Sequence, residues 1–216
     1  VHYVEHNRVF RRRMPPQVAA MFTALAPYAS FPLRFVFGNL WLFRPVLLRV
    51  LPLISAQAGA MIRTTIAFTM ARGSDACNVM PQEASISANV RFIPHQGMRE
   101  SLEILQKTSH MFGLEMTVAH AVDFTQATDT QGAAFKTVQQ TAARVFPGCP
   151  SIPYVMTGAT DARFYQEICD SVVRFAPVVY GPEQMRGMHG LNETIEYACL
   201  PGAVAFYKEL IEAVGQ

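Results

Sequence analysis

The sequence predicts two structural classes in one chain, an α+β unit followed by an α/β unit. In the first half, apolar residues at helical spacing are followed by segments in which apolar and polar residues alternate, and a period of two is typical of half-buried strands. In the second half, helical patterns alternate with short apolar runs of strand length, an order typical of α/β proteins.

The composition is that of a globular protein with a sizeable core. Of 216 residues, 50% are hydrophobic and 16% are charged, and the formal net charge is +2. So small a charge does not indicate a nucleic-acid-binding protein, and the basic run Arg11–Arg13 is predicted to be a solvated loop. Four widely spaced cysteines are predicted to be reduced thiols. The compartment stays open, with the cytoplasm favoured, because no signal pattern is found.

Helical patterns occupy most of the first 54 residues. A proline pair followed by apolar residues predicts a helix from about Gln17 to Ala26. Two further helices are predicted, Leu33–Leu42 and Val46–Leu51, with Pro45 opening the second. The apolar region Phe31–Ile54 is interrupted by arginines and prolines, which argues against a transmembrane span. Two buried helices are favoured over an interfacial or lipid-facing surface.

Alternating patterns predict a small sheet after these helices. Two neighbouring strands, at 64–70 and 84–92, flank a turn-rich segment. A helix beginning near Met98 and a third strand at Leu114–Val118 follow. This order predicts an α+β layer with helices on one face of the sheet.

The second half begins a new unit at about Gly132. Its predicted elements are, in order, a helix to Val145, a break at Pro147–Gly148, a strand at Ile152–Met156, a helix through Phe164 and Ile168 capped by Thr160 or Asp161, a strand at Val172–Phe175 and a last helix from Pro201 to Val214. These strands are too few for a complete doubly wound sheet.

His189 is the first candidate functional residue. It lies in a predicted loop between Met188 and Gly190, close to Glu193, a carboxylate that could orient the imidazole for metal binding or catalysis. Taken alone, a surface histidine that hydrogen-bonds its own loop is the favoured interpretation.

The segment Thr157–Arg163 joins a predicted strand to a predicted helix. Its backbone N–H groups and the helix dipole could bind a carboxylate or phosphate, and Arg163 could add a bidentate contact. Taken alone, an ordinary turn with a capping threonine is favoured.

Two candidates lie in the predicted sheet region. Asn78 precedes the second strand, where its amide could polarise a carbonyl, although a turn asparagine has the same pattern. Arg91 projects from the polar face of that strand and, on its own, is more often a solvated or ion-paired residue than an anion clamp. His95, His110 and His120 have no ligand spacing and are taken as structural.

Four segments together resemble one family. Asn78–Pro81, Asn89–Arg91, Gly158–Arg163 and His189–Glu193 appear in the order and rough spacing seen in the dizinc aminoacylase/carboxypeptidase metallopeptidases, which include acetylornithine deacetylase and succinyl-diaminopimelate desuccinylase. The apolar region Gln17–Leu53 is similar to the branch that contains Gly-X carboxypeptidase and N-acyl amino acid hydrolases.

The resemblance implies a domain organisation and an activity. Residues 1–123 would form a ferredoxin-like α+β lid that carries an apolar helical insertion and mediates a homodimer, and residues 124–216 would form the C-terminal part of an α/β catalytic domain. The family's zinc-dependent enzymes cleave the amide bond of a peptide or N-acyl amino acid with a free carboxylate. The apolar residues of the predicted lid and the similarity to the branch of N-acyl amino acid hydrolases suggest that the substrate side chain is apolar.

The resemblance also implies residue roles. His189 would be a zinc ligand, Asn78 would polarise the scissile carbonyl in the partner subunit's active site, and Arg91, Gly158 and Thr160 would hold the substrate carboxylate. Arg163 would be an addition to that carboxylate site.

The chain departs from the family pattern in its metal ligands. The His-x-Asp pair, the bridging Asp, the Glu-Glu pair and the next acidic ligand are expected upstream of Val1, and the lid's Gly-His motif is missing. We therefore expect that the chain alone neither binds two zinc ions tightly nor hydrolyses amides. The alternative is a non-catalytic dimerisation or small-molecule-binding module.

Overall fold

The computed structural model describes residues 1–7 and 9–215. The chain divides into two compact units, Val1–Gln126 and Ala127–Gln216. We call them unit 1 and unit 2 and describe each by itself. The assignment of a lid and a catalytic part to the two halves stays a prediction.

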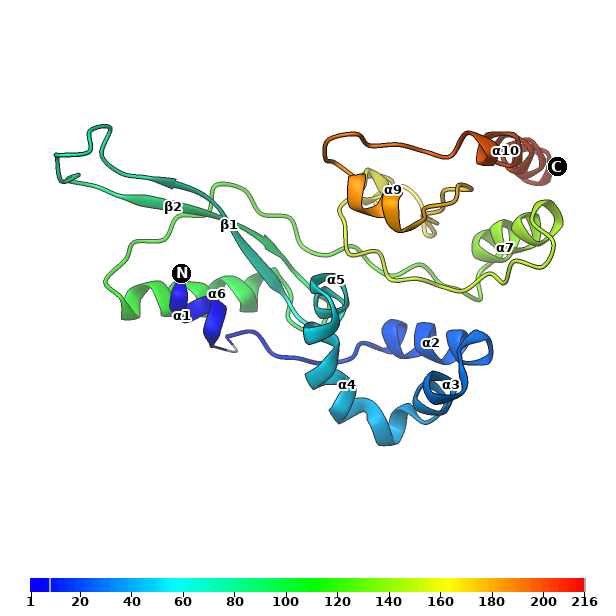
Figure 1. The fold of residues 1–216 in the computed structure, drawn as a ribbon, viewed down its shortest axis with the longest axis horizontal. Coiled ribbons are helices and arrows are strands. Elements are labelled where there is room, and N and C mark those ends of the chain that lie inside the picture. Colours follow the sequence, from blue (N-terminus) through cyan, green and yellow to red (C-terminus); the bar gives the residue numbers. More distant parts are fainter. Residues whose placement is uncertain (8, 216) are drawn as a thin grey trace. The chain divides into compact units, whose positions relative to one another are not determined.

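Unit 1 combines helices with one two-stranded sheet, which confirms the α+β class (Figure 1). Its elements are α1 (His2–His6), α2 (Pro16–Leu25), η1 (Ala26–Tyr28), α3 (Phe31–Gly38), α4 (Leu40–Ile54), α5 (Ala56–Ala60), β1 (Thr65–Arg72), β2 (Ser85–Arg91) and α6 (Met98–Met111). Unit 2 contains α7 (Ala133–Val145), α8 (Ala162–Tyr165), α9 (Pro182–Gly187), η2 (Tyr197–Cys199) and α10 (Leu200–Val214).

The core of unit 1 forms around α2. Pro16 is the first residue of this helix, where its missing N–H costs no hydrogen bond. Val18 and Phe22 are buried on one face, and the Phe22 ring stacks on Phe37 of α3 with 4.8 Å between ring centroids. The helix predicted from residue 17 is therefore confirmed, and apolar packing against α3 stabilises it.

Pro45 does not open a helix, contrary to the prediction. Instead, α4 starts at Leu40 and continues through both Pro45 and Pro52. The Asn39 carbonyl accepts the first hydrogen bonds of this helix, so it is already established before the proline. Gly59 of α5 allows close packing, because a Cβ there would lie 3.3 Å from the Pro52 Cα.

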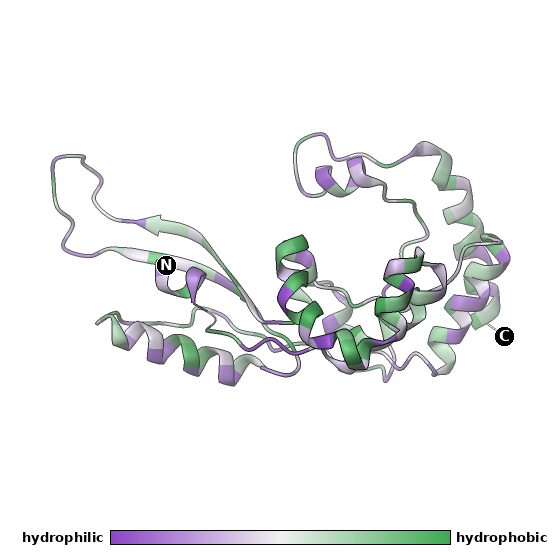
Figure 2. Cartoon of the chain, turned by 60° about the horizontal axis from the view of Figure 1, so that its bottom comes forward, coloured by the Kyte–Doolittle hydropathy of each residue, from purple (hydrophilic) through white to green (hydrophobic). Residues whose placement is uncertain are grey.

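The α3–α4 region is not the pair of buried helices that the sequence favours. Both helices are largely hydrophobic (Figure 2), yet Leu40, Leu47 and Leu51 are the buried residues of α4 and Phe37 is the buried residue of α3. Among the described residues, no single helix meets the length and hydropathy of a membrane span; α3 and α4 do so only together, with a 110° bend between them.

The sheet is an antiparallel pair with a bulge. Thr65 lies opposite Arg91, and the register shifts between Phe68 and Met70. Because Met70 pairs with Ser87, the bulge moves it from the apolar face to the polar face of the sheet. The sequence predicts Ile66, Phe68 and Met70 on one face of this strand, which is right for Ile66 and Phe68 and wrong for Met70.

Three predicted strands are wrong. Residues 114–118, 152–156 and 172–175 have no strand structure, and no strand occurs among the described residues of unit 2. The predicted α/β character of this unit is thus not seen. A strand exists only where a neighbouring backbone pairs with it, and apolar alternation alone does not supply that neighbour.

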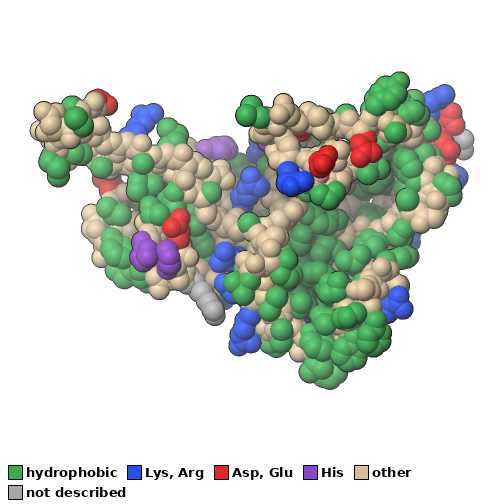
Figure 3. Space-filling view, viewed as in Figure 1, with side chains coloured by type: hydrophobic (Ala, Val, Ile, Leu, Met, Phe, Trp, Pro, Cys, Tyr) green, Lys and Arg blue, Asp and Glu red, His purple; other side chains and the backbone are tan. Residues whose placement is uncertain are grey.

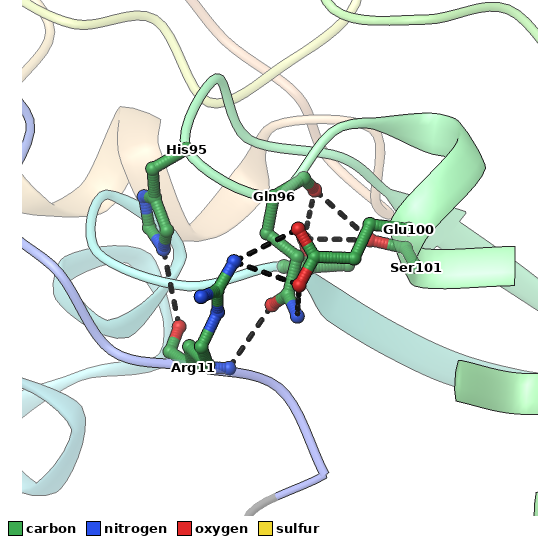
Figure 4. A network of polar contacts seen from close by, with 6 residues as sticks. Arg11, His95, Gln96, Glu100 and Ser101 are labelled. Atoms are coloured by element: carbon green, nitrogen blue, oxygen red, sulfur yellow. Dashed lines mark hydrogen bonds and ion pairs between the residues drawn. The ribbon is translucent and has the colours of Figure 1, made fainter. Parts of the chain in front are cut away.

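The segment Arg11–Arg13 is a loop with Arg11 and Arg13 exposed, as predicted, and hydrogen bonds of Arg11 hold it in place (Figure 4). The guanidinium of Arg11 donates to both oxygens of Glu100, at 2.7 and 2.8 Å, and its backbone N–H donates to the Gln96 side chain at 3.0 Å. The Gln96 carbonyl accepts from the buried Ser101 hydroxyl at 2.9 Å. The N-terminal segment is thereby fixed to the start of α6.

Unit 2 packs around Phe206 of α10, which is fully buried. The rings of Phe175 and Phe146 lie 4.8 and 6.4 Å from it between centroids. Gly202, one turn earlier, faces Phe146 so closely that a Cβ would lie 2.9 Å from the ring. Helices α7 and α10, both predicted from the sequence, therefore pack through aromatic rings and one glycine.

Candidate functional site

The candidate residues are divided between the two units. Asn78 and Arg91 belong to unit 1, whereas Gly158, Thr160, Arg163 and His189 belong to unit 2. The local geometry of each group is given below.

Arg91 is the last residue of β2 and is exposed. The register places it on the same sheet face as Asn89, Ser87 and, at the other end of the ladder, Arg72. This agrees with the polar face read from the sequence. The guanidinium thus lies at one end of a polar strip, where a carboxylate can approach from solvent.

Asn78 lies in the exposed loop between β1 and β2, at the far end of the hairpin from Arg91 (Figure 1). A turn surrounds it, since the Val79 N–H donates to the Ala76 carbonyl at 3.3 Å. A strand of the length of β2 spans roughly 20 Å. Unit 1 therefore does not bring Asn78 and Arg91 together, and the two side chains cannot contact one small ligand within it.

Thr160 is held by an arginine that the sequence analysis missed. The Arg174 guanidinium donates through Nε to the Thr160 hydroxyl at 3.1 Å, and both residues are partly buried. One sequence feature could have identified Arg174 as a candidate, because it is the single charged residue in the apolar run Val172–Phe175. Charged residues in such runs are rarely without a partner. A cationic group and a hydroxyl side by side form a suitable carboxylate-binding pair.

The helix after Thr160 differs from the prediction. It is α8, only four residues long, and neither Thr160 nor Asp161 caps it with a side-chain hydrogen bond. So short a helix has little dipole to offer an anion. The Arg163 guanidinium lies 4.6 Å from the centroid of the Phe164 ring, a cation–π contact at an exposed position.

Gly158 is exposed and sterically unconstrained. A Cβ at this position would meet only the Met156 sulfur, at 3.9 Å. No described residue therefore requires a glycine at this position for steric reasons.

His189 lies in a tight loop with an unusual backbone. Its φ is 58°, in the left-handed region, and the following Gly190 N–H donates to the Gly187 carbonyl at 2.8 Å. The Glu193 carboxylate accepts from the His189 backbone N–H at 3.1 Å. Glu193 therefore holds the loop rather than the imidazole, contrary to the prediction, and the imidazole is left exposed.

The described residues do not assemble a complete metal site. Across 1–7 and 9–215, no group of three or more His, Cys, Asp or Glu side chains is placed to hold an ion. His189 offers one exposed nitrogen ligand, whereas a zinc site needs at least three protein ligands. The residues of this chain thus do not fit a zinc centre by themselves.

Comparison with known proteins places these residues in a family. The model of Peptidase family M20/M25/M40 matches residues 18–213. The chain is 36% identical over 193 residues to the N-fatty-acyl-amino acid synthase/hydrolase PM20D1 of Xenopus tropicalis, covering 89% of this chain and 38% of that protein.

Two further relatives carry other names. Probable carboxypeptidase S-like 2 of Dictyostelium discoideum is 28% identical over 193 residues, covering 89% of this chain and 37% of that protein. Succinyl-diaminopimelate desuccinylase of Xanthomonas campestris pv. campestris (strain B100) is 27% identical over 151 residues, covering 65% of this chain and 35% of that protein.

The chain thus spans well under half the length of these relatives. No solved structure matches it. The family match includes all six candidate residues, and the relatives bear out the resemblance that the four segments indicated. The chain belongs to Peptidase family M20/M25/M40.

Proposed function

We propose that the chain supplies a carboxylate-binding site and one metal ligand of a zinc-dependent amidohydrolase or exopeptidase, which acts on a peptide or N-acyl amino acid with a free carboxylate. The observation that carries this proposal is the family match over residues 18–213. The relative named N-fatty-acyl-amino acid synthase/hydrolase supports an apolar acyl group on the substrate.

The substrate carboxylate is proposed to bind at Arg91 and at the turn of Gly158 and Thr160, with Arg163 as an addition. The Arg174–Thr160 contact supports this, because it fixes the hydroxyl and keeps a positive charge beside it. Arg163 can leave its exposed Phe164 ring at small cost, since a cation–π contact at such a site is worth only about 0.5–1 kcal/mol.

His189 is proposed to be one of the zinc ligands, with its partner ligands supplied from outside this chain. Its exposed imidazole and left-handed backbone support this, because strained backbone is found preferentially at functional sites. When bound, zinc would serve as a Lewis acid. This chain alone is proposed to be inactive.

Unit 1 is proposed to be a ferredoxin-like lid that forms a homodimer, with Asn78 reaching the partner subunit's active site. Two features support this. Each strand of the two-stranded sheet has one edge not paired by the other strand, and such an edge can pair with a second copy. The loop that carries Asn78 extends beyond the end of the sheet, where it can reach another subunit (Figure 1).

The proposal is tested on the full-length gene product with Arg91→Met and Arg72→Met. Both substitutions remove one arginine from the same sheet face, but Arg72 lies at the other end. For an N-acyl amino acid, R91M should lower kcat/KM by about 10- to 100-fold, as expected for a lost charge-assisted hydrogen bond. R72M should have little effect.

Kinetics with the carboxamide of the same substrate distinguish an effect of R91M on substrate binding from an effect on the protein fold. It has no charge for Arg91 to bind, so R91M should leave its kcat/KM close to the wild-type value. An equal loss with the acid and with the carboxamide would show that Arg91 acts on the fold and not on the substrate carboxylate.

The competing proposal is a small-molecule-binding or dimerisation module without catalysis. One observation favours it: the Arg174–Thr160 pair needs no metal to bind a carboxylate. Calorimetric titration of an N-acyl amino acid into the full-length gene product, with a chelator present, distinguishes the two. Tight binding without turnover after zinc is restored would support the module and contradict the enzyme.

A further inference from the structure

Helix α4 carries a stripe of exposed apolar side chains. Leu42, Val46, Val50 and Leu53 follow one another at spacings of four, four and three residues, which places them on one helix face. All four are exposed, Leu53 by 83%. We call these four residues the α4 stripe. It lies on the side of the helix away from the buried Leu47.

Aromatic side chains add to the exposed apolar surface at the start of each helix, Phe31 in α3 and Trp41 in α4. Phe31 and Trp41 are each 80% exposed. Figure 3 shows hydrophobic side chains gathered over the corner between α3 and α4, with Lys and Arg side chains at the margins and no Asp or Glu among them. An exposed apolar patch rimmed by charged side chains marks a surface that contacts protein or lipid.

The charge around the α4 stripe has one sign. Residues 6–74 contain nine arginines and no aspartate or glutamate. Arg34, Arg44 and Arg49 of α3 and α4 are exposed. Arg34 donates to the Pro27 carbonyl at 2.9 Å and Arg49 to the Pro45 carbonyl at 3.4 Å, so both guanidinium groups hydrogen-bond to backbone carbonyls. Such a surface is complementary to an anionic, apolar partner.

We propose that the α3–α4 corner is a membrane-binding surface that docks onto anionic phospholipid. The α4 stripe and the two aromatic rings enter the boundary between headgroups and acyl chains. Arg34, three residues after Phe31, and Arg49, four residues before Leu53, lie beside these apolar residues and contact lipid phosphates. The helices lie in the plane of the interface. This function is independent of the proposed hydrolase activity.

A second copy of this chain is a poorer occupant of the surface. A two-fold contact through the α4 stripe would place the same surface of both copies together. Arg49, beside the α4 stripe, would then face the arginine of the other copy, with no acidic residue in α3 or α4 to neutralise it. Like charges brought together in this way oppose association.

The sequence provides its own reporter for this surface. Trp41 is the only tryptophan in the chain, so its fluorescence reports on the corner alone. Phosphatidylcholine vesicles that contain phosphatidylserine should shift the Trp41 emission to the blue and protect it from acrylamide, and a brominated acyl chain in those vesicles should quench it. Vesicles of phosphatidylcholine alone should give a much smaller shift, and high salt should reverse binding.

Paired variants test the two components of the surface by vesicle flotation. Arg34→Gln with Arg49→Gln should weaken partitioning into anionic vesicles about thirtyfold, from the usual attraction of about 1 kcal/mol for each arginine near such a membrane. The control, Arg72→Gln with Arg99→Gln, removes the same charge elsewhere in unit 1 and should partition nearly as the wild type does. Both control arginines are exposed.

The apolar component has a matched control as well. Val46→Gln with Leu53→Gln should abolish flotation, whereas Leu114→Gln with Val118→Gln should not. All four residues are at least half exposed, so neither pair is expected to disturb the core. Circular dichroism of each variant establishes that the fold is retained.

Three results would overturn the proposal. The first is an unchanged Trp41 emission with anionic vesicles. The second is an oligomer, seen by sedimentation in the absence of lipid, in which the Trp41 emission is already shifted to the blue and protected from acrylamide. This would mean that a second copy covers the corner. The third is a full-length gene product that does not float with anionic vesicles, which would mean that other residues of the protein cover it.

Discussion

At the scale of single residues, His95 links ionisation to the fold of unit 1. Its Nε2 donates to the Arg11 carbonyl at 3.2 Å, so the unprotonated nitrogen is Nδ1. Nδ1 is buried, and no described residue bonds to it. Burial lowers the pKa of His95 below its ordinary value of 6.5. The hydrogen bond to the Arg11 backbone and the charge of Glu100 oppose this shift, whereas the charges of Arg13 and Arg11 add to it.

We expect His95 to make unit 1 less stable in acid. The unfolded chain protonates this imidazole near pH 6.5, whereas the folded chain does so only at lower pH, so acidification through this range favours unfolding. His95→Gln keeps an N–H donor for Arg11 and cannot take up a proton. Its free energy of unfolding in urea should fall less between about pH 7.5 and pH 5 than that of the wild type.

His110, on the exposed side of α6, provides the control for this experiment. His110→Gln should leave the acid-induced fall as it is in the wild type. A fall in H95Q as large as in the wild type would contradict the link between His95 and stability.

His189 is the residue at which stability and function are expected to conflict. A left-handed φ costs an ordinary residue about 1–2 kcal/mol, and glycine avoids that cost. His189→Gly should therefore leave the stability of unit 2 unchanged or raise it by up to about 1 kcal/mol, while the full-length gene product loses bound zinc by elemental analysis.

Asn192, with a φ of 59° in the same loop, is the matched control. Asn192→Gly should have the same effect on stability and no effect on zinc content. If H189G instead destabilised unit 2, the imidazole would have a structural role, and the proposed metal role would lose its support.

At the scale of secondary-structure elements, the packing of α10 on α7 depends on close approach. Gly202→Ala should lower the free energy of unfolding of unit 2 by about 1–3 kcal/mol, because the added Cβ meets the Phe146 ring at 2.9 Å. Gly38→Ala, at the end of α3, meets nothing within 4 Å and should be neutral or slightly stabilising. Denaturant unfolding of the two variants checks this, and equal effects would contradict it.

Elements were predicted well where the local sequence decides them. Helices α2, α6, α7 and α10 follow from apolar spacing together with proline or glycine at their ends. One example is the C-terminus of α6, where Gly113 has a φ of 66° and ends the helix. The three missing strands share an apolar pattern, but no strand lies beside them in the part of the chain that the structure describes. Pattern indicates which residues prefer a sheet, while pairing decides whether they join one.

At the scale of the whole molecule, exposed apolar residues and the charges around them distinguish the surfaces of the two units. Large apolar residues are exposed in both units, including Leu191 and Tyr197 at 93% and 84%. Exposed apolar surface of this extent marks contact with further protein or with lipid. For the α3–α4 corner, the unbroken positive charge favours lipid, whereas the apolar residues of unit 2 have no comparable charge pattern around them.

The sequence by itself determined the family, the helices α2, α6, α7 and α10, the two paired strands and six of the candidate residues. These depend on local spacing and on short motifs such as Gly158–Arg163 and His189–Glu193, which a linear reading contains in full. It also provided the acid-free charge pattern of residues 6–74.

Only the tertiary structure decided which side chains meet. In the folded chain, Arg174 donates a hydrogen bond to Thr160, and Glu193 accepts one from a backbone N–H and not from the imidazole. Met70 lies on the polar face of the sheet, and the α4 stripe is exposed. The physical reason is the same in each case. Hydrogen bonds, strand register and burial depend on residues that are adjacent only after the chain has folded, and local pattern carries no information about those distances.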